Sequence, residues 1–126
     1  MKRKDYKSNF EYQVHKVLRS RVAYEPKRVP YVIRKNYTPD FIGTAPSGRE
    51  VWFESKGYFR PGDIQKYKEI ISQYPEVDFV FIFMNPNNRM PGSKVRKDGS
   101  RASMRSWADD NGYMWCTYKE ANKYVR

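Results

Sequence analysis

The segment from Asp78 to Asn85, with the sequence DFVFIFMN, constrains the fold of this chain of 126 residues more than any other. It is short, almost entirely apolar and β-rich in composition, which is typical of a central strand that is covered on both faces. Such a strand requires a sheet with further layers packed on each side. The length of the chain allows one compact domain, so we expect one sheet and one core.

The remaining pattern predicts a mixed central β-sheet flanked by helices, which is an α/β (α+β) fold. Apolar residues at helical spacing predict helices over residues 9–20, 61–74 and 103–111, and a final short helix after Thr117. Short β-branched and aromatic runs predict strands over residues 29–33, 37–42, 51–58 and 113–116. Pro39 indicates that its strand either begins at or after this residue or lies at an edge of the sheet. We expect a single domain over residues 1–126, with a basic arm at 1–8 and a basic loop at 86–102.

The charge of the chain predicts a polyanionic partner. Lys and Arg number 25 against 14 Asp and Glu, a formal net charge of +11, and nucleic acid is the simplest partner for such an excess. The basic residues concentrate in residues 1–35 and 89–105, where clusters of this kind bind phosphates without reading base sequence. The predicted DNA contacts are Lys2, Arg3, Lys4, Lys7, Arg34, Lys35, Lys94, Arg96, Lys97 and Arg101.

Other features narrow the cellular setting. No apolar run approaches the ~20 residues that a membrane span needs, and no apolar stretch follows the basic start as a secretion signal requires. The single cysteine, Cys116, favours a reducing compartment. We therefore expect a cytoplasmic protein with no membrane partner.

Two short motifs carry the acids that could perform chemistry. Asp40 follows Pro39, and Glu54 and Lys56 share one face of the next predicted strand, about 7 Å apart. If the two strands pair, Asp40 and Glu54 converge, and their mutual repulsion favours a hard divalent cation with oxygen ligands. A metal there could activate water and stabilise charge on a scissile phosphate, with Lys56 orienting the water.

The same residues have a simpler interpretation that remains open. Charged residues that alternate along a strand usually form its solvated face, which would make the chain a non-catalytic basic DNA-binding module. Glu11, at the edge of the apolar stripe of the first predicted helix, either faces a cleft or is a solvated rim residue.

Larger blocks of sequence carry a resemblance. The blocks VPYVI at 29–33, YTPDF at 37–41, FESKG at 53–57 and YPEVD at 74–78, together with Ser8 to Glu11, resemble the phage endonuclease I family of junction-resolving enzymes in the PD-(D/E)XK nuclease superfamily. The resemblance runs from about residue 8 to residue 115. It implies a restriction-endonuclease-like core, an intertwined (domain-swapped) homodimer and cleavage of four-way (Holliday) and other branched DNA.

The resemblance also implies roles for individual residues. Glu11, Asp40, Glu54 and Lys56 are expected to be catalytic, with metal bound by Asp40, Glu54 and the backbone carbonyl of Ser55. Glu11 is expected to come from the opposite subunit. We expect Mg²⁺, with Mn²⁺ as a substitute, two ions in each active site and no small-molecule cofactor. The alternative within the superfamily is an endonuclease that acts on duplex DNA, of a repair, restriction-like or homing type.

Overall fold

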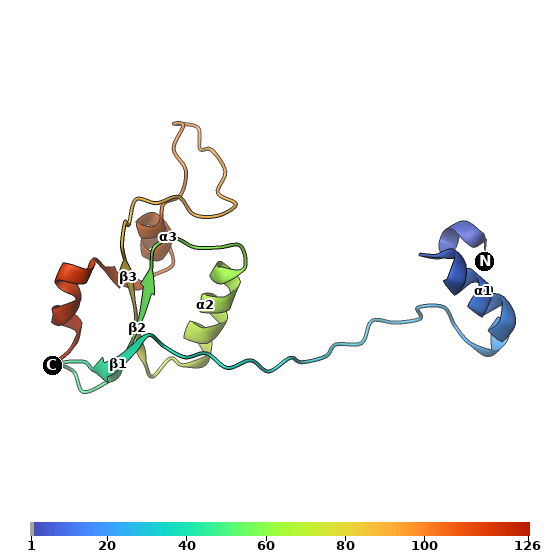
Figure 1. Cartoon of the computed structure of the whole chain (residues 1–126), viewed down its shortest axis with the longest axis horizontal. Helices are drawn as coiled ribbons and strands as arrows, with labels where there is room; N and C mark the ends of the chain where they lie inside the picture. The colour runs from blue at the N-terminus through green and yellow to red at the C-terminus, as the bar shows by residue number, and fades with distance from the viewer. Residues whose placement is uncertain (1) are drawn as a thin grey trace. The chain divides into compact units, whose positions relative to one another are not determined.

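A computed structural model describes residues 2–126, which form two compact units that divide between Lys35 and Asn36 (Figure 1). Met1, the first residue of the predicted basic arm, lies outside the described residues. The expected single nuclease domain over residues 1–126 stays a prediction. None of the helices in residues 2–126 has the length and apolar character needed to cross a membrane.

The unit of residues 36–126 contains a mixed four-stranded sheet. Its strands are β1 (Phe41–Thr44), β2 (Glu50–Lys56), β3 (Asp78–Phe83) and β4 (Met114–Cys116), and they lie side by side in chain order. β1 is antiparallel to β2, whereas β2, β3 and β4 are parallel to one another. The predicted class, a mixed sheet flanked by helices, is confirmed.

β3 is the central strand that its composition predicts. Phe79, Phe81 and Phe83 pack into a cluster with the helices α2 (Asp63–Gln73) and α3 (Met104–Asp110). Val80, which alternates with them, packs on the other face, where the 3-10 helix η3 (Tyr118–Tyr124) contributes to a smaller cluster. Figure 1 shows α2 and η3 on opposite sides of the sheet.

Turn residues set the ends of the elements around the sheet. β1 begins directly after Pro39 and Asp40, as Pro39 predicts. The hairpin to β2 closes through Ala45, whose N–H donates to the carbonyl of Arg49 at 2.8 Å. α2 begins after Gly62, which has a φ of 93° that glycine adopts without strain.

The unit of residues 2–35 is built around α1 (Asn9–Leu18), between the short 3-10 helices η1 (Arg3–Asp5) and η2 (Arg19–Arg21). Ser8 caps α1, because its hydroxyl accepts the N–H of Glu11 at 3.1 Å. The buried ring of Tyr6 packs against Tyr12 and Tyr24, and its hydroxyl forms a 2.7 Å hydrogen bond with Nδ1 of His15. α1 ends two residues earlier than predicted.

The predicted strand at residues 29–33 is wrong for this chain. These residues form no helix or strand, and Tyr31 and Val32 are more than four-fifths exposed. A β-branched and aromatic composition fits a strand only when another strand satisfies its backbone and covers a face. The three strands expected before α2 are therefore two, β1 and β2.

Candidate active site

The pairing of β1 with β2 brings Asp40 beside Glu54. Phe41 pairs with Phe53, and the N–H of Asp40 donates to the carbonyl of Phe53 at 3.1 Å. The Asp40 carboxylate in turn accepts the N–H of Ser55 through Oδ2 at 2.8 Å. The hairpin thus fixes the position of Asp40 from both its backbone and its side chain.

Glu54 is buried, with 7% of its surface exposed, and it is the one buried charged residue in the described part of the chain. Helix α2 covers its strand face, and the hydroxyl of Tyr67 donates to Oε1 of Glu54 at 2.5 Å. Phe81 is its partner on the neighbouring strand. The interpretation of this face as an ordinary solvated strand face is therefore wrong at Glu54.

Asp40 and Glu54 are electrostatically coupled. A hydrogen bond with the Glu54 carboxyl, and then the Ser55 N–H, hold the pKa of Asp40 below its usual value. Burial raises the pKa of Glu54, and the interaction with Asp40 raises it further. Burial and the neighbouring carboxyl group therefore both disfavour the charged form of Glu54, and a cation beside the pair would relieve this cost.

Lys56 lies on the same strand face as Glu54 and near the start of α2. Its ammonium is 3.6 Å from Oδ2 of Asp63 and 4.9 Å from the centre of the Tyr67 ring, and its side chain is 20% exposed. Asp63 is itself held by the N–H of Arg60 at 2.9 Å. The lysine therefore has a defined position with one side open to solvent.

Sequence reasoning did not identify Tyr37, Asp63 and Tyr67 as residues of this site. The spacing of Asp63 and Tyr67, four residues apart on one helix, was an available signal, because such residues share a helix face. The hydroxyl of Tyr37 is buried and has no hydrogen-bond partner within residues 2–126. Burial raises the pKa of Tyr37, and the charges of Glu54 and Asp40 add to the effect.

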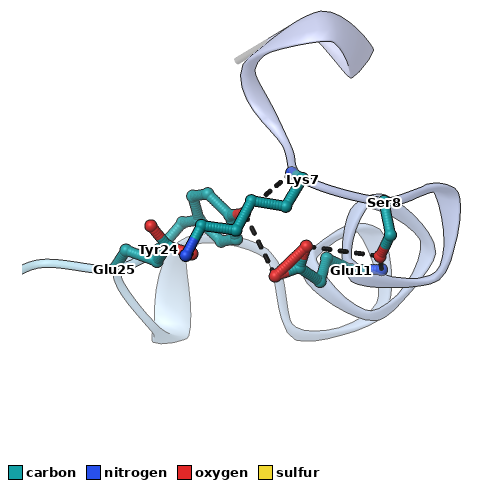
Figure 2. A network of polar contacts seen from close by, with 5 residues as sticks. All are labelled: Lys7, Ser8, Glu11, Tyr24 and Glu25. Atoms are coloured by element: carbon teal, nitrogen blue, oxygen red, sulfur yellow. Dashed lines mark hydrogen bonds and ion pairs between the residues drawn. The ribbon is translucent and has the colours of Figure 1, made fainter. Parts of the chain in front are cut away.

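Glu11 belongs to the unit of residues 2–35, whereas Asp40, Glu54 and Lys56 form one cluster in the other unit. Figure 2 shows the network around it. Oε2 of Glu11 accepts the Ser8 hydroxyl and Oε1 accepts the Tyr24 hydroxyl, each at 3.2 Å. The Tyr24 hydroxyl accepts the N–H of Lys7 at 3.1 Å, and Lys7 pairs with Glu25. The role of Glu11 in catalysis stays a prediction.

The predicted DNA contacts lie at the surface. Nine of the ten are exposed, and Arg3 is half-buried. In the basic loop, Asn87, Arg89, Gly99 and Arg101 line an open hollow of about 320 Å³. These positions are accessible to a large polyanion, and their role in binding stays a prediction.

The donors available for a metal are two carboxylates. No group of three or more Asp, Glu, His or Cys residues assembles within residues 2–126. The Ser55 N–H engages Oδ2 of Asp40 and the Tyr67 hydroxyl engages Oε1 of Glu54, which leaves Oδ1 of Asp40 and Oε2 of Glu54 for the interaction between the two carboxyl groups or for a cation. This set fits Mg²⁺, which commonly takes one or two carboxylates and completes its shell with waters and substrate phosphate.

Comparison with known proteins matches the chain to one family. A model of the family described as phage endonuclease I matches residues 1–125. The chain is 34% identical over 116 residues to endodeoxyribonuclease 1 of Enterobacteria phage T3, covering 87% of this chain and 70% of that protein. It is 34% identical over 91 residues to endonuclease I of Escherichia phage T7, covering 68% of this chain and 58% of that protein.

Proposed function

This chain belongs to the phage endonuclease I family, and from that premise we propose that it is a metal-dependent endodeoxyribonuclease that cleaves four-way and other branched DNA. The observation that carries the proposal is the burial of Glu54 beside Asp40. A buried carboxylate is destabilising unless a donor or cation compensates it, so a chain that needed only a basic DNA-binding surface would gain nothing from it.

We propose Mg²⁺ at this position, with Mn²⁺ able to replace it and two ions per site. The free oxygens of Asp40 and Glu54 and the backbone carbonyl of Ser55 would hold the metal. A bound divalent ion supplies Lewis-acid stabilisation of the phosphate and lowers the pKa of a coordinated water. The arrangement of these residues at the β1–β2 hairpin, followed by α2, supports a PD-(D/E)XK core.

Lys56 has a distinct task in this mechanism. Lys56 follows Glu54 by two residues on β2, so the two side chains share one strand face. The Lys56 side chain is partly exposed, and its ammonium can therefore contact a phosphate oxygen or the attacking water. The ion pair with Asp63 fixes the position of the lysine ammonium beside the start of α2. The aromatic residues of α2 and β3 exclude bulk water from the inner side of the site, which strengthens each of these charge interactions.

We further propose an intertwined homodimer in which Glu11 acts in the active site of the partner. Phe10 and Val17, on the apolar stripe of α1, are 73% and 70% exposed, and residues 29–33 lack the partner strand that their composition requires. Exposed apolar surfaces of this extent in a soluble chain are typical of a protein interface. Two active sites in one assembly can cut two strands of one junction.

The ten basic residues listed for DNA contact are proposed to bind the junction arms through their phosphates. Their exposure and their position in the N-terminal unit and the loop of residues 86–102 support this role. Phosphate contacts of this kind select shape rather than base sequence, and the affinity should fall with salt. We place the activity in the compartment that holds the DNA, the host cytoplasm.

The proposal is tested by substrate choice. A labelled four-way junction and a linear duplex of the same arm sequences are incubated with the protein, with and without Mg²⁺. We expect Mg²⁺-dependent cuts near the branch point of the junction and much slower cutting of the duplex. Equal rates on the two substrates would support a duplex endonuclease instead, and binding without any cutting would support a non-catalytic module.

A further inference from the structure

Tyr67 is the most deeply buried polar side chain that contacts the candidate site. It is 1% exposed on the inner face of α2, and its ring packs against Phe79 and Phe81 of β3. Packing alone does not need a hydroxyl here, because a buried hydroxyl loses its hydration and must find a partner. That partner is Oε1 of Glu54 at 2.5 Å.

This hydrogen bond restricts how Glu54 can present its carboxylate. With Oε1 held by Tyr67, Oε2 is the oxygen left for Asp40 or a cation. Asp40 is restricted in a parallel way, because the Ser55 N–H holds its Oδ2 and leaves Oδ1. Each carboxylate therefore has one oxygen tied to the protein, and the tie to Glu54 comes from a helix rather than from the hairpin itself.

We propose that Tyr67 is a positioning residue, which holds Glu54 in the orientation that binds the divalent metal. This inference rests on the proposed function, since it assumes that Glu54 is a metal ligand. Residues that hydrogen-bond to a metal-binding side chain, and so orient it, commonly contribute about 10-fold to 100-fold to metal affinity. Tyr67 acts through Glu54 and needs no contact with DNA.

The matched control is Tyr113, which belongs to the same aromatic surroundings. Its ring lies 6.3 Å from that of Phe81, whereas the Tyr67 ring lies 5.4 Å from it, both measured between centroids. Within residues 2–126, no hydrogen bond joins the Tyr113 hydroxyl to Asp40, Glu54 or Lys56. Tyr67→Phe and Tyr113→Phe thus remove the same atom from one cluster, and only the first removes the hydrogen bond to Glu54.

The experiment titrates Mn²⁺ into each full-length protein without DNA and measures free Mn²⁺ by electron paramagnetic resonance. We expect Tyr67→Phe to bind Mn²⁺ at least about 10-fold more weakly than the wild type, and Tyr113→Phe to bind as the wild type does. Wild-type affinity in a folded Tyr67→Phe protein would overturn the inference. Equal weakening in both variants would also overturn it, because the effect would then reflect packing.

Glu54→Gln separates this inference from the proposed function. If Glu54→Gln loses Mn²⁺ and Tyr67→Phe keeps it, only the role of Tyr67 fails. If Glu54→Gln keeps wild-type affinity, the proposed metal site and this inference fail together.

Should Tyr67→Phe not fold, the wild-type protein still provides a test by NMR. A Tyr67 hydroxyl proton that is protected from exchange in the wild type and lost in Glu54→Leu, which has no acceptor, supports the inference. Its absence in the wild type, or its persistence in Glu54→Leu, overturns the inference.

Discussion

The burial of Glu54 ties the stability of the metal-free protein to pH. Its pKa lies above the ordinary value of 4.5, mainly because burial disfavours the charged form. Below pH 4.5 the group is protonated in both the folded and the unfolded chain, and its contribution to stability is fully present. That contribution is lost as the pH rises through the folded pKa. Asp40 acts in the opposite sense at lower pH, since its pKa is held below 3.8.

We therefore expect the free energy of unfolding of the metal-free wild type to fall, relative to Glu54→Gln, as the pH rises from 4.5 through the pKa of Glu54. Urea denaturation at a series of pH values, with a chelator present, measures this difference. Added Mg²⁺ should restore stability at neutral pH in the wild type alone. Parallel pH profiles for the two proteins would contradict the burial of an ionisable group at position 54.

Tyr37 allows a second prediction at the level of one atom. Its hydroxyl is buried without a partner in the described structure, and an unsatisfied buried hydroxyl costs about 1–3 kcal/mol. Tyr37→Phe should leave the free energy of unfolding unchanged or raise it by about 1 kcal/mol. Urea denaturation in metal-free buffer checks this, and a loss of stability would show that the hydroxyl has a partner in solution.

Among the elements, β3 contributes the centre of the core. Phe81 is fully buried between α2 and α3, and its ring has six aromatic neighbours: Phe59, Tyr67, Phe79, Phe83, Trp107 and Tyr113. Phe81→Ala should lower the free energy of unfolding by about 3–5 kcal/mol. Tyr118→Ala, at a position that is 74% exposed, should change it by less than about 0.5 kcal/mol. Comparable losses in chemical denaturation of the two variants would contradict this account of the core.

The elements also show which parts of the fold the sequence could predict. α1, α2 and β3 depend on patterns within their own residues, namely the helical spacing of apolar residues in α1 and α2 and the apolar run of β3. All three were predicted with ends within a few residues. Residues 29–33 have the composition of a strand and no partner, and pairing depends on a distant segment that local pattern does not identify.

The candidate site was predicted in part for the same reason. Alternation along β2 placed Glu54 and Lys56 on one face, and the strand pairing brought Asp40 to them. Two features of the site depend on packing between elements, which periodicity does not describe. These are the burial of Glu54 by α2 and the hydrogen bond from the Tyr67 hydroxyl to Glu54. The shared face of Glu54 and Lys56 on β2 was therefore predicted, whereas the packing of α2 over that face was not.

At the scale of the whole molecule, the exposed stripe of α1 predicts an assembly. We expect the wild type to have twice the mass of one chain in light scattering at micromolar concentration. Val17→Asp, which places a charge in the stripe, should shift the mass toward a single chain, because burying an unpaired charge at an interface is costly. Val95→Asp is the control, since Val95 is also exposed but lies in the basic loop. A wild type with the mass of one chain would contradict the proposed homodimer.

The central claim is that the buried Glu54, together with the neighbouring, exposed Asp40, forms the metal-dependent catalytic site of a nuclease. Its most direct test is the single-turnover rate of cleavage of a labelled four-way junction in Mg²⁺ by Glu54→Gln, with Glu76→Gln, a change at an exposed glutamate, as the control. Junction binding is measured separately in Ca²⁺. We expect Glu54→Gln to bind the junction as the wild type does and to cut it at least about 100-fold more slowly, and Glu76→Gln to match the wild type in both. Cleavage by Glu54→Gln at the wild-type rate would contradict the claim.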